Sequence, residues 1–209
     1  EAGSFAYAGV DELGQVRQNS TWTEKHIHAI LKLDLVDTRA VAARKFKVVV
    51  DAVNSVGGVA VPMLLEALGV EVVKLYCEPT GHFPHNPEPL PEHLTDLCAE
   101  VVKQKAHLGI SVDPDVDRLA LVCEDGSLFG EEYTLVACAD HVLANRPGDT
   151  VSNLSSTRAL NDIAERHGRK RHASAVGEVN VVELMRQVNA PIGGEGNGGV
   201  ILSELHYGR

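Results

Sequence analysis

Apolar residues follow an alternation of strand-like and helix-like segments along most of the chain. Runs of consecutive apolar and β-branched residues are typical of strands buried on both faces. They predict strands over 46–53, 70–77, 107–112, 119–123, 150–154, 170–175 and 201–205. Apolar residues that recur every three or four positions are typical of amphipathic helices. They predict helices over 57–68, 91–105, 131–144, 157–167 and 179–188.

The first 44 residues show a different pattern. Thr21 and Glu24 have the spacing of a capping box, which predicts a helix that continues to about Leu35. No strand-like run accompanies this helix, so we expect residues 1–44 to be the tail of a preceding domain and a linker. The opening residues 1–4 lack the basic and apolar regions of a signal peptide and contain no Met, so we expect the natural chain to begin earlier.

The alternation restarts once along the chain. Residues 146–149, Arg-Pro-Gly-Asp, are the best linker candidate, because Pro and Gly interrupt the periodic segments there. We therefore predict an α/β fold class, with one α/β domain over 45–147 and a similar, smaller one over 148–209.

Charge and composition exclude several classes of function. The formal net charge is −10, which argues against a nucleic-acid partner. No run of eighteen apolar residues suggests a membrane span. The four cysteines form no C-x-x-C pair, so we expect reduced, buried thiols and a cytoplasmic protein.

The clearest chemical motif is the acidic segment that follows the strand 107–112. Asp113, Asp115 and Asp117 alternate with Pro114 and Val116, so an extended backbone would direct the three carboxylates the same way. Three carboxylates this close repel one another, and a hard divalent cation such as Mg²⁺ relieves that repulsion. The next residue, Arg118, adds a guanidinium suited to phosphate.

Two other interpretations of the acidic segment stay open, and a third fails. A solvated acidic turn is one alternative, and a haloacid-dehalogenase-like phosphotransferase with Asp113 as nucleophile is another, although Asp117 departs from that family's motif. An EF-hand fails on geometry. Its sixth position needs Gly but is Arg118, and the intervening strand would carry Glu124 roughly 20 Å from Asp117.

A second motif, Gly193-Gly194-Glu195-Gly196-Asn197-Gly198-Gly199, precedes the last predicted strand. Glycines let a ligand approach the backbone. The Glu195 carboxylate can accept hydrogen bonds from sugar hydroxyls, and the Asn197 amide can donate and accept them. Taken alone, the motif favours a flexible hairpin turn, because Asn197-Gly198 is itself a turn signal.

The two motifs together, in this order and about eighty residues apart, resemble those of the α-D-phosphohexomutase superfamily. The family's metal loop, D-P-D-x-D-R, is matched by 113–118, and its sugar loop, G-E-x-S-G-H, by Gly194, Glu195 and Gly198. Weaker matches lie at 51–58, 83–89 and 176–177. Asn197 replaces the family's Ser and Gly199 its His, which puts the sugar preference in question.

The resemblance implies the second and third domains of a four-domain enzyme, two consecutive α/β/α domains with mixed sheets. It implies metal ligands Asp113, Asp115 and Asp117 for Mg²⁺, a catalytic Arg118, and substrate-binding Gly194, Glu195 and Asn197. A phosphoserine in the first domain and a phosphate-binding loop in the fourth would be missing, so we expect this chain alone to be inactive. The family interconverts hexose 1-phosphates and 6-phosphates through a bisphosphate; the alternatives are a dehalogenase-like phosphatase and a non-catalytic module that binds sugar phosphate or metal.

Overall fold

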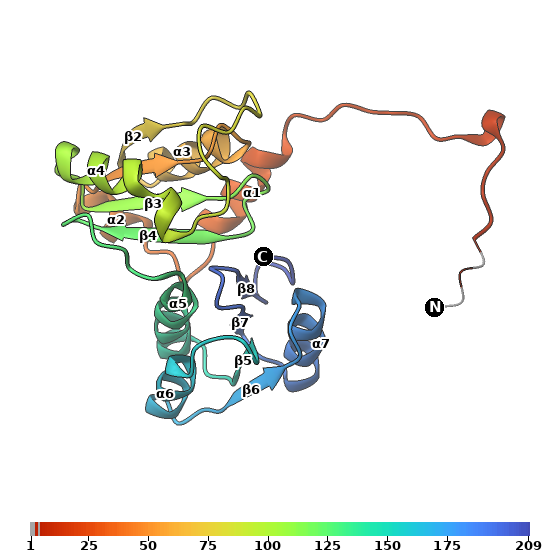
Figure 1. The fold of residues 1–209 in the computed structure, drawn as a ribbon. Coiled ribbons are helices and arrows are strands. Elements are labelled where there is room, and N and C mark those ends of the chain that lie inside the picture. The colour runs from red at the N-terminus through yellow and green to blue at the C-terminus, as the bar shows by residue number, and fades with distance from the viewer. Residues whose placement is uncertain (1–2, 4) are drawn as a thin grey trace.

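The computed structural model describes residue 3 and residues 5–209 (Figure 1). Residues 1, 2 and 4, which belong to the opening segment 1–4 discussed above, lie outside the described residues. Residues 5–20 run away from both sheets and contain only the short 3-10 helix η1 (Val10–Glu12). Packed structure begins at α1 (Trp22–Leu31), which buries Ile27 and ends before the predicted Leu35.

The predicted capping box at the start of α1 does not form. The Thr21 hydroxyl donates instead to Asn19 Oδ1 at 2.8 Å, and no side chain caps the helix. Asn and Asp side chains often bond to nearby polar groups in this way, in competition with helix capping.

The first sheet has four strands in the order β2-β1-β3-β4. Strand β1 pairs in parallel with β2 and β3, whereas β4 is antiparallel to β3. The elements of this part of the chain are α2 (Thr38–Ala43), β1 (Lys47–Asp51), α3 (Gly57–Ala67), β2 (Glu71–Leu75), η2 (Pro91–His93), α4 (Thr95–Gln104), β3 (Leu108–Val112) and β4 (Leu119–Cys123).

The second sheet repeats this topology with the order β6-β5-β7-β8. Strand β5 is parallel to β6 and β7, and β8 is antiparallel to β7. The elements here are α5 (Glu131–Asn145), β5 (Thr150–Asn153), α6 (Ala159–Arg166), β6 (Arg171–Ser174), α7 (Glu178–Val188), β7 (Ile192–Gly194) and β8 (Val200–Leu202). The prediction of two similar α/β/α units with mixed sheets is confirmed.

Helices cover both faces of each sheet. Val48 and Val50 of β1 pack on the face covered by α3, and Val49 packs on the opposite face against Leu97 and Val101 of α4. In the second sheet, one core joins α5 and α6 to Ile192, and the other joins α7 to Val151 and Ile201. Burial on both faces explains why the central strands read as continuous apolar runs.

Helix α5 bears on the predicted division of the chain. We predicted it as the closing helix of the domain 45–147, but its buried residues, including Leu135 and Ala139, share a core with α6 and β7. Figure 1 shows it running from the first sheet alongside the second. The boundary at 147 stays a prediction, and this packing favours a boundary before α5.

None of the helices in the described part of the chain combines the length and the hydrophobicity that a membrane span requires. All four cysteines are free and partly buried. The Cys77 thiol donates to the Val50 carbonyl oxygen at 3.3 Å. Burial, followed by the nearby Asp51 carboxylate, raises the pKa of Cys77 to about 11.

We expect Cys77 to react with iodoacetamide at pH 8 about two orders of magnitude more slowly than an unhindered thiol, because only the thiolate reacts and burial disfavours it. The rate should rise roughly tenfold per pH unit up to about pH 10. Mass spectrometry of the folded chain and of the same chain in urea measures both rates. Equal rates in the two states would contradict this burial.

Candidate functional site

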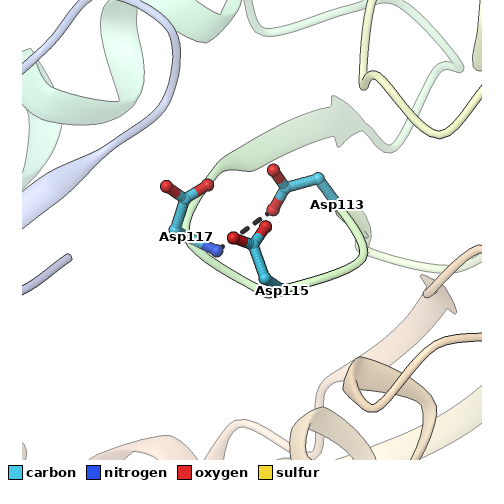
Figure 2. A group of neighbouring side chains, drawn as sticks. All are labelled: Asp113, Asp115 and Asp117. Atoms are coloured by element: carbon cyan, nitrogen blue, oxygen red, sulfur yellow. Dashed lines mark hydrogen bonds between the residues drawn. The ribbon is translucent and has the colours of Figure 1, made fainter. Parts of the chain in front are cut away.

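The aspartate loop (residues 113–118) connects the carboxyl end of β3 to β4. Asp113, Asp115 and Asp117 each place a carboxylate oxygen within 4.8 Å of the other two. Figure 2 shows the three side chains around this one loop. The predicted convergence is therefore present, but the predicted extended backbone is wrong. Val116 has φ 64° and its N–H donates to the Asp113 carbonyl oxygen at 3.1 Å. A turn brings the carboxylates together.

The Asp113 side chain holds this turn closed. Its Oδ1 accepts hydrogen bonds from the backbone N–H groups of Asp117 and Arg118, both at 3.0 Å. Arg118 Nε donates to Oδ2 at 2.8 Å. Burial acts to raise the pKa of Asp113. The hydrogen bonds from Arg118 and the hydrogen bond with the Asp117 side chain outweigh burial, so the pKa is lowered. Asp113 is thus a buried carboxylate stabilised in its ionised form.

The pKa of Asp117 is shifted in the opposite direction, upward. Burial, then hydrogen bonding with Asp113 and the charges of Asp113 and Asp115, raises the pKa of Asp117, although Arg209 opposes the shift. The loop therefore holds negative charge that its own residues do not fully balance. An all-oxygen donor set suits Mg²⁺, and the three carboxylates, whose oxygens lie within 4.8 Å of one another, would have to draw closer together to bind one ion, since adjacent ligands of octahedral Mg²⁺ lie about 3 Å apart.

Arg118 joins the aspartate loop to the long loop that follows β2. Its Nη1 lies 3.1 Å from Glu88 Oε1, and its Nε lies 3.7 Å from Asp117 Oδ1 in addition to the bond with Asp113. The Arg118 side chain is 27% exposed, so the guanidinium is held in place but remains accessible.

The glycine-rich loop is part of a hairpin. We predicted a turn before the last strand, yet Gly193 and Gly194 already belong to β7, and β8 ends at Leu202 instead of 205. Glu195 N–H donates to the Gly199 carbonyl oxygen at 2.9 Å. Asn197 Oδ1 accepts from Gly199 N–H at 3.1 Å, so the Asn197 side chain stabilises the turn itself.

Glu195 is buried, with 7% of its side chain exposed, and both of its oxygens are engaged. Oε1 accepts from Asn153 Nδ2 at 2.6 Å and from Gly177 N–H at 3.1 Å. Oε2 accepts from Arg209 Nη1 at 2.6 Å. A carboxylate offers about four acceptor positions, so Glu195 is fixed in orientation and still able to accept another hydrogen bond.

The two loops lie side by side in space. Leu119 N–H, just after the aspartate loop, donates to the Gly198 carbonyl oxygen at 3.2 Å. Arg209 bridges them, with Nη2 2.9 Å from Asp117 Oδ2 and Nη1 2.6 Å from Glu195 Oε2. The structure therefore brings the predicted metal ligands and the predicted sugar-binding residues together between the two sheets.

A cavity of about 240 Å³ opens beside Glu195. It is lined by Glu131, Glu132, Asn153, Ser155, Val176, Glu195, Gly196 and Asn197. Burial, and then the neighbouring Glu132 and Glu88 carboxylates, raises the pKa of Glu131. The cavity is thus rich in hydrogen-bond acceptors, which suits a ligand with several hydroxyl groups.

Sequence reasoning missed Asn153 and Arg209. Asn153 ends β5, and the carboxyl ends of parallel strands meet at one edge of a sheet, where ligands bind. That rule could have identified it. Arg209 follows the irregular segment after β8, and no sequence pattern indicates its position.

We expect Asn153→Ala to lower the free energy of unfolding by about 2 kcal/mol, because Glu195 loses a buried donor. The two hydroxyls that bond Asn153 Oδ1, those of Ser155 and Ser156, also lose their partner. Urea denaturation measures the change. Asn161→Ala is the matched control, since Asn161 Nδ2 donates to Glu165 at 2.7 Å on the exposed face of α6. Equal losses in the two variants would contradict the positioning of Glu195 by Asn153.

Two consecutive parts of the chain match models of one protein family. Residues 24–126 match phosphoglucomutase/phosphomannomutase α/β/α domain II, and residues 130–209 match α/β/α domain III. A phosphoglucomutase/phosphomannomutase of Thermococcus kodakarensis is 36% identical over 207 residues, which cover 98% of this chain and 45% of the relative.

Solved structures agree with these matches. A phosphoglucomutase/phosphomannomutase family protein of Burkholderia thailandensis has a TM-score of 0.76 and 29% identity, over 89% of this chain and 40% of that one. An N-acetylphosphoglucosamine mutase of Aspergillus fumigatus, in complex with GlcNAc-6P and magnesium, has a TM-score of 0.57 over 88% of this chain and 40% of that one, and at 15% identity shows the fold alone. The chain spans less than half the length of the relatives it matches.

Proposed function

We propose a function for this chain from one premise: it belongs to the phosphoglucomutase/phosphomannomutase family, of which it contains α/β/α domains II and III. The chain supplies the metal-binding loop and the sugar-binding loop of a phosphohexomutase. The complete enzyme interconverts the 1-phosphate and 6-phosphate of glucose, mannose or glucosamine. The observation that carries the proposal is the contact between the two loops, made by the bridge from Asp117 through Arg209 to Glu195.

Asp113, Asp115 and Asp117 would hold Mg²⁺. The support is their approach to within 4.8 Å and the raised pKa of Asp117, which results first from burial and then from the hydrogen bond with Asp113 and the charges of Asp113 and Asp115. When bound, Mg²⁺ would offset the negative charge of phosphoryl oxygens during transfer. Asp113, which is buried and already hydrogen-bonded, keeps the loop in the geometry that binding requires.

Arg118 would contact the phosphoryl group and is therefore the proposed catalytic residue. Its guanidinium is held by Asp113 and Glu88, so little conformational entropy is lost when it meets a phosphate oxygen. Both partners of Arg118 are carboxylates, so they balance the charge of the guanidinium when no phosphate is bound.

Gly194, Glu195 and Asn197 would bind the sugar. The Glu195 carboxylate, fixed by Asn153 and Gly177, accepts hydrogen bonds from ring hydroxyls, and the cavity beside it has room for part of a hexose. A mutase must hold its sugar in two orientations. Hydrogen-bond acceptors that bind the hydroxyls of the ring, and do not bind the phosphate group, can serve the sugar in both orientations.

The family resemblance assigns the remaining groups to other domains of the complete protein, a phosphoserine in the first and a phosphate-binding loop in the fourth. The dehalogenase-like alternative needs Asp113 as a free nucleophile. Here both Asp113 oxygens accept hydrogen bonds from Asp117 and Arg118, which disfavours that role.

The protein encoded by the complete reading frame tests the proposal. We expect ³¹P NMR to show conversion of glucose 1-phosphate to glucose 6-phosphate, dependent on Mg²⁺ and on a trace of glucose 1,6-bisphosphate. Release of inorganic phosphate would instead support the phosphatase. Binding of Mg²⁺ and hexose phosphate without conversion of glucose, mannose or glucosamine phosphates would support the non-catalytic module.

A further inference from the structure

Arg209 is paired with acidic groups from three separate elements. Its Nη2 lies 2.9 Å from Asp117 in the aspartate loop, its Nη1 lies 2.6 Å from Glu195 in the glycine-rich loop, and its Nε lies 3.2 Å from Glu178 at the start of α7. Only 16% of the Arg209 side chain is exposed. A planar guanidinium can serve several carboxylates at once, which a lysine ammonium does less well.

Gly199 makes room for this side chain. A Cβ at position 199 would lie 2.7 Å from Arg209 Cδ and 2.9 Å from Arg209 Nη1, closer than real contacts allow. Position 199 is also where the resembling sugar motif carries His. In this chain the space beside the glycine-rich loop is therefore filled by an arginine that comes from ten residues further along the sequence.

We propose that Arg209 is a positioning residue that couples the metal loop to the sugar loop, and that Gly199 is required for it. The inference rests on the proposed function of the two loops. Arg209 balances the charge of Asp117 when Mg²⁺ is absent and holds Glu195 in the orientation that binds sugar hydroxyls. Mg²⁺ and Arg209 thus compete for Asp117, whereas sugar and Arg209 cooperate at Glu195.

These two relations predict opposite effects when the charge is removed. In Arg209→Gln, Mg²⁺ should bind on the order of fivefold more tightly, because a competing cation beside Asp117 is gone. Glucose 1-phosphate, titrated in saturating Mg²⁺, should bind about tenfold more weakly, because Glu195 is no longer held. Calorimetry measures the first affinity and NMR chemical-shift titration the second.

Two further variants separate charge from geometry. Arg209→Lys keeps the positive charge, so its Mg²⁺ affinity should stay near that of the unaltered chain, while its sugar-phosphate affinity falls. Gly199→Ala displaces the Arg209 side chain without removing it, so it should weaken glucose 1-phosphate binding too. In the double variant with Arg209→Gln, the two losses should not add, because both act through one contact.

Arg146→Gln is the matched control. Arg146 also bridges two carboxylates, Asp34 and Glu204, but away from the two loops, so neither affinity should change. If Arg209→Gln lowers both affinities together, or changes neither, the coupling is refuted and Arg209 is only a structural contact. If the protein encoded by the complete reading frame binds neither Mg²⁺ nor glucose 1-phosphate, the proposed function falls, and the inference falls with it.

Discussion

Replacing Asp113 with asparagine is expected to weaken Mg²⁺ binding by more than about 100-fold and to lower the free energy of unfolding by about 3 kcal/mol. The variant removes one of three carboxylates from the proposed metal site. Whichever way the new amide turns, its N–H₂ group faces a donor, either Arg118 Nε, which lies 2.8 Å from Asp113 Oδ2, or the backbone N–H groups of Asp117 and Arg118. Calorimetric titration with Mg²⁺ and urea denaturation measure the two effects.

Asp125→Asn is the control for this variant. Asp125 is exposed and also closes a turn, because its Oδ1 accepts from Ser127 N–H at 2.9 Å and from the Ser127 hydroxyl at 2.6 Å. It lies outside the cluster of three aspartates, so Mg²⁺ affinity should not change and stability should change by less than about 1 kcal/mol. Undiminished Mg²⁺ binding in Asp113→Asn would rule Asp113 out as a ligand.

Gly198→Ala is expected to lower the free energy of unfolding by about 3 kcal/mol and to weaken hexose phosphate binding at least about tenfold. Gly198 has φ 89°, and an added Cβ would press against the Leu119 backbone, 3.0 Å from its nitrogen and closer still to its carbonyl oxygen. The glycine-rich loop would have to move away from β4, and Glu195 would move with it. Thermal unfolding and NMR titration with glucose 1-phosphate measure the changes.

Gly168→Ala provides the comparison for Gly198. Gly168 also has positive φ, 67°, but a Cβ there would meet nothing within 4 Å. Its replacement should therefore cost only the backbone strain, about 1 kcal/mol, and leave ligand binding intact. If the two alanine variants lose equal stability, the loop containing Gly198 is not seated against β4 in solution.

Strand and helix periodicity predicted most of this fold because its central strands are buried on both faces. Runs such as 46–53 and 107–112 carry a strong signal for that reason. The strand β7 was missed because it consists of Ile192, Gly193 and Gly194, and glycines add nothing to a hydrophobic pattern. Those glycines are needed because Met185 and the Gly199 carbonyl group lie against them.

The aspartate loop was predictable in composition but not in conformation. Alternation of Asp113, Asp115 and Asp117 suggested an extended strand, whereas hydrogen bonds back to the Asp113 side chain impose a turn. Asp side chains that bond to following backbone N–H groups favour such turns, and this local preference outweighed the alternation.

The contact between the two loops could not be derived from periodicity. It depends on how one sheet packs beside the other, and the side chains that join the two loops come from residues far apart in the sequence. The family resemblance suggested that both loops serve one site. The bridging role of Arg209 follows only from its side-chain contacts with Asp117 and Glu195 in the folded structure.

The most direct test of a shared site is paramagnetic broadening by Mn²⁺ bound in place of Mg²⁺. If the aspartate loop binds the metal beside the sugar loop, amide NMR signals of residues 113–118 and also of 195–199 should broaden, while that of Gly168 stays sharp. Broadening of the aspartate loop alone, with the signals of 195–199 unchanged, would contradict the account.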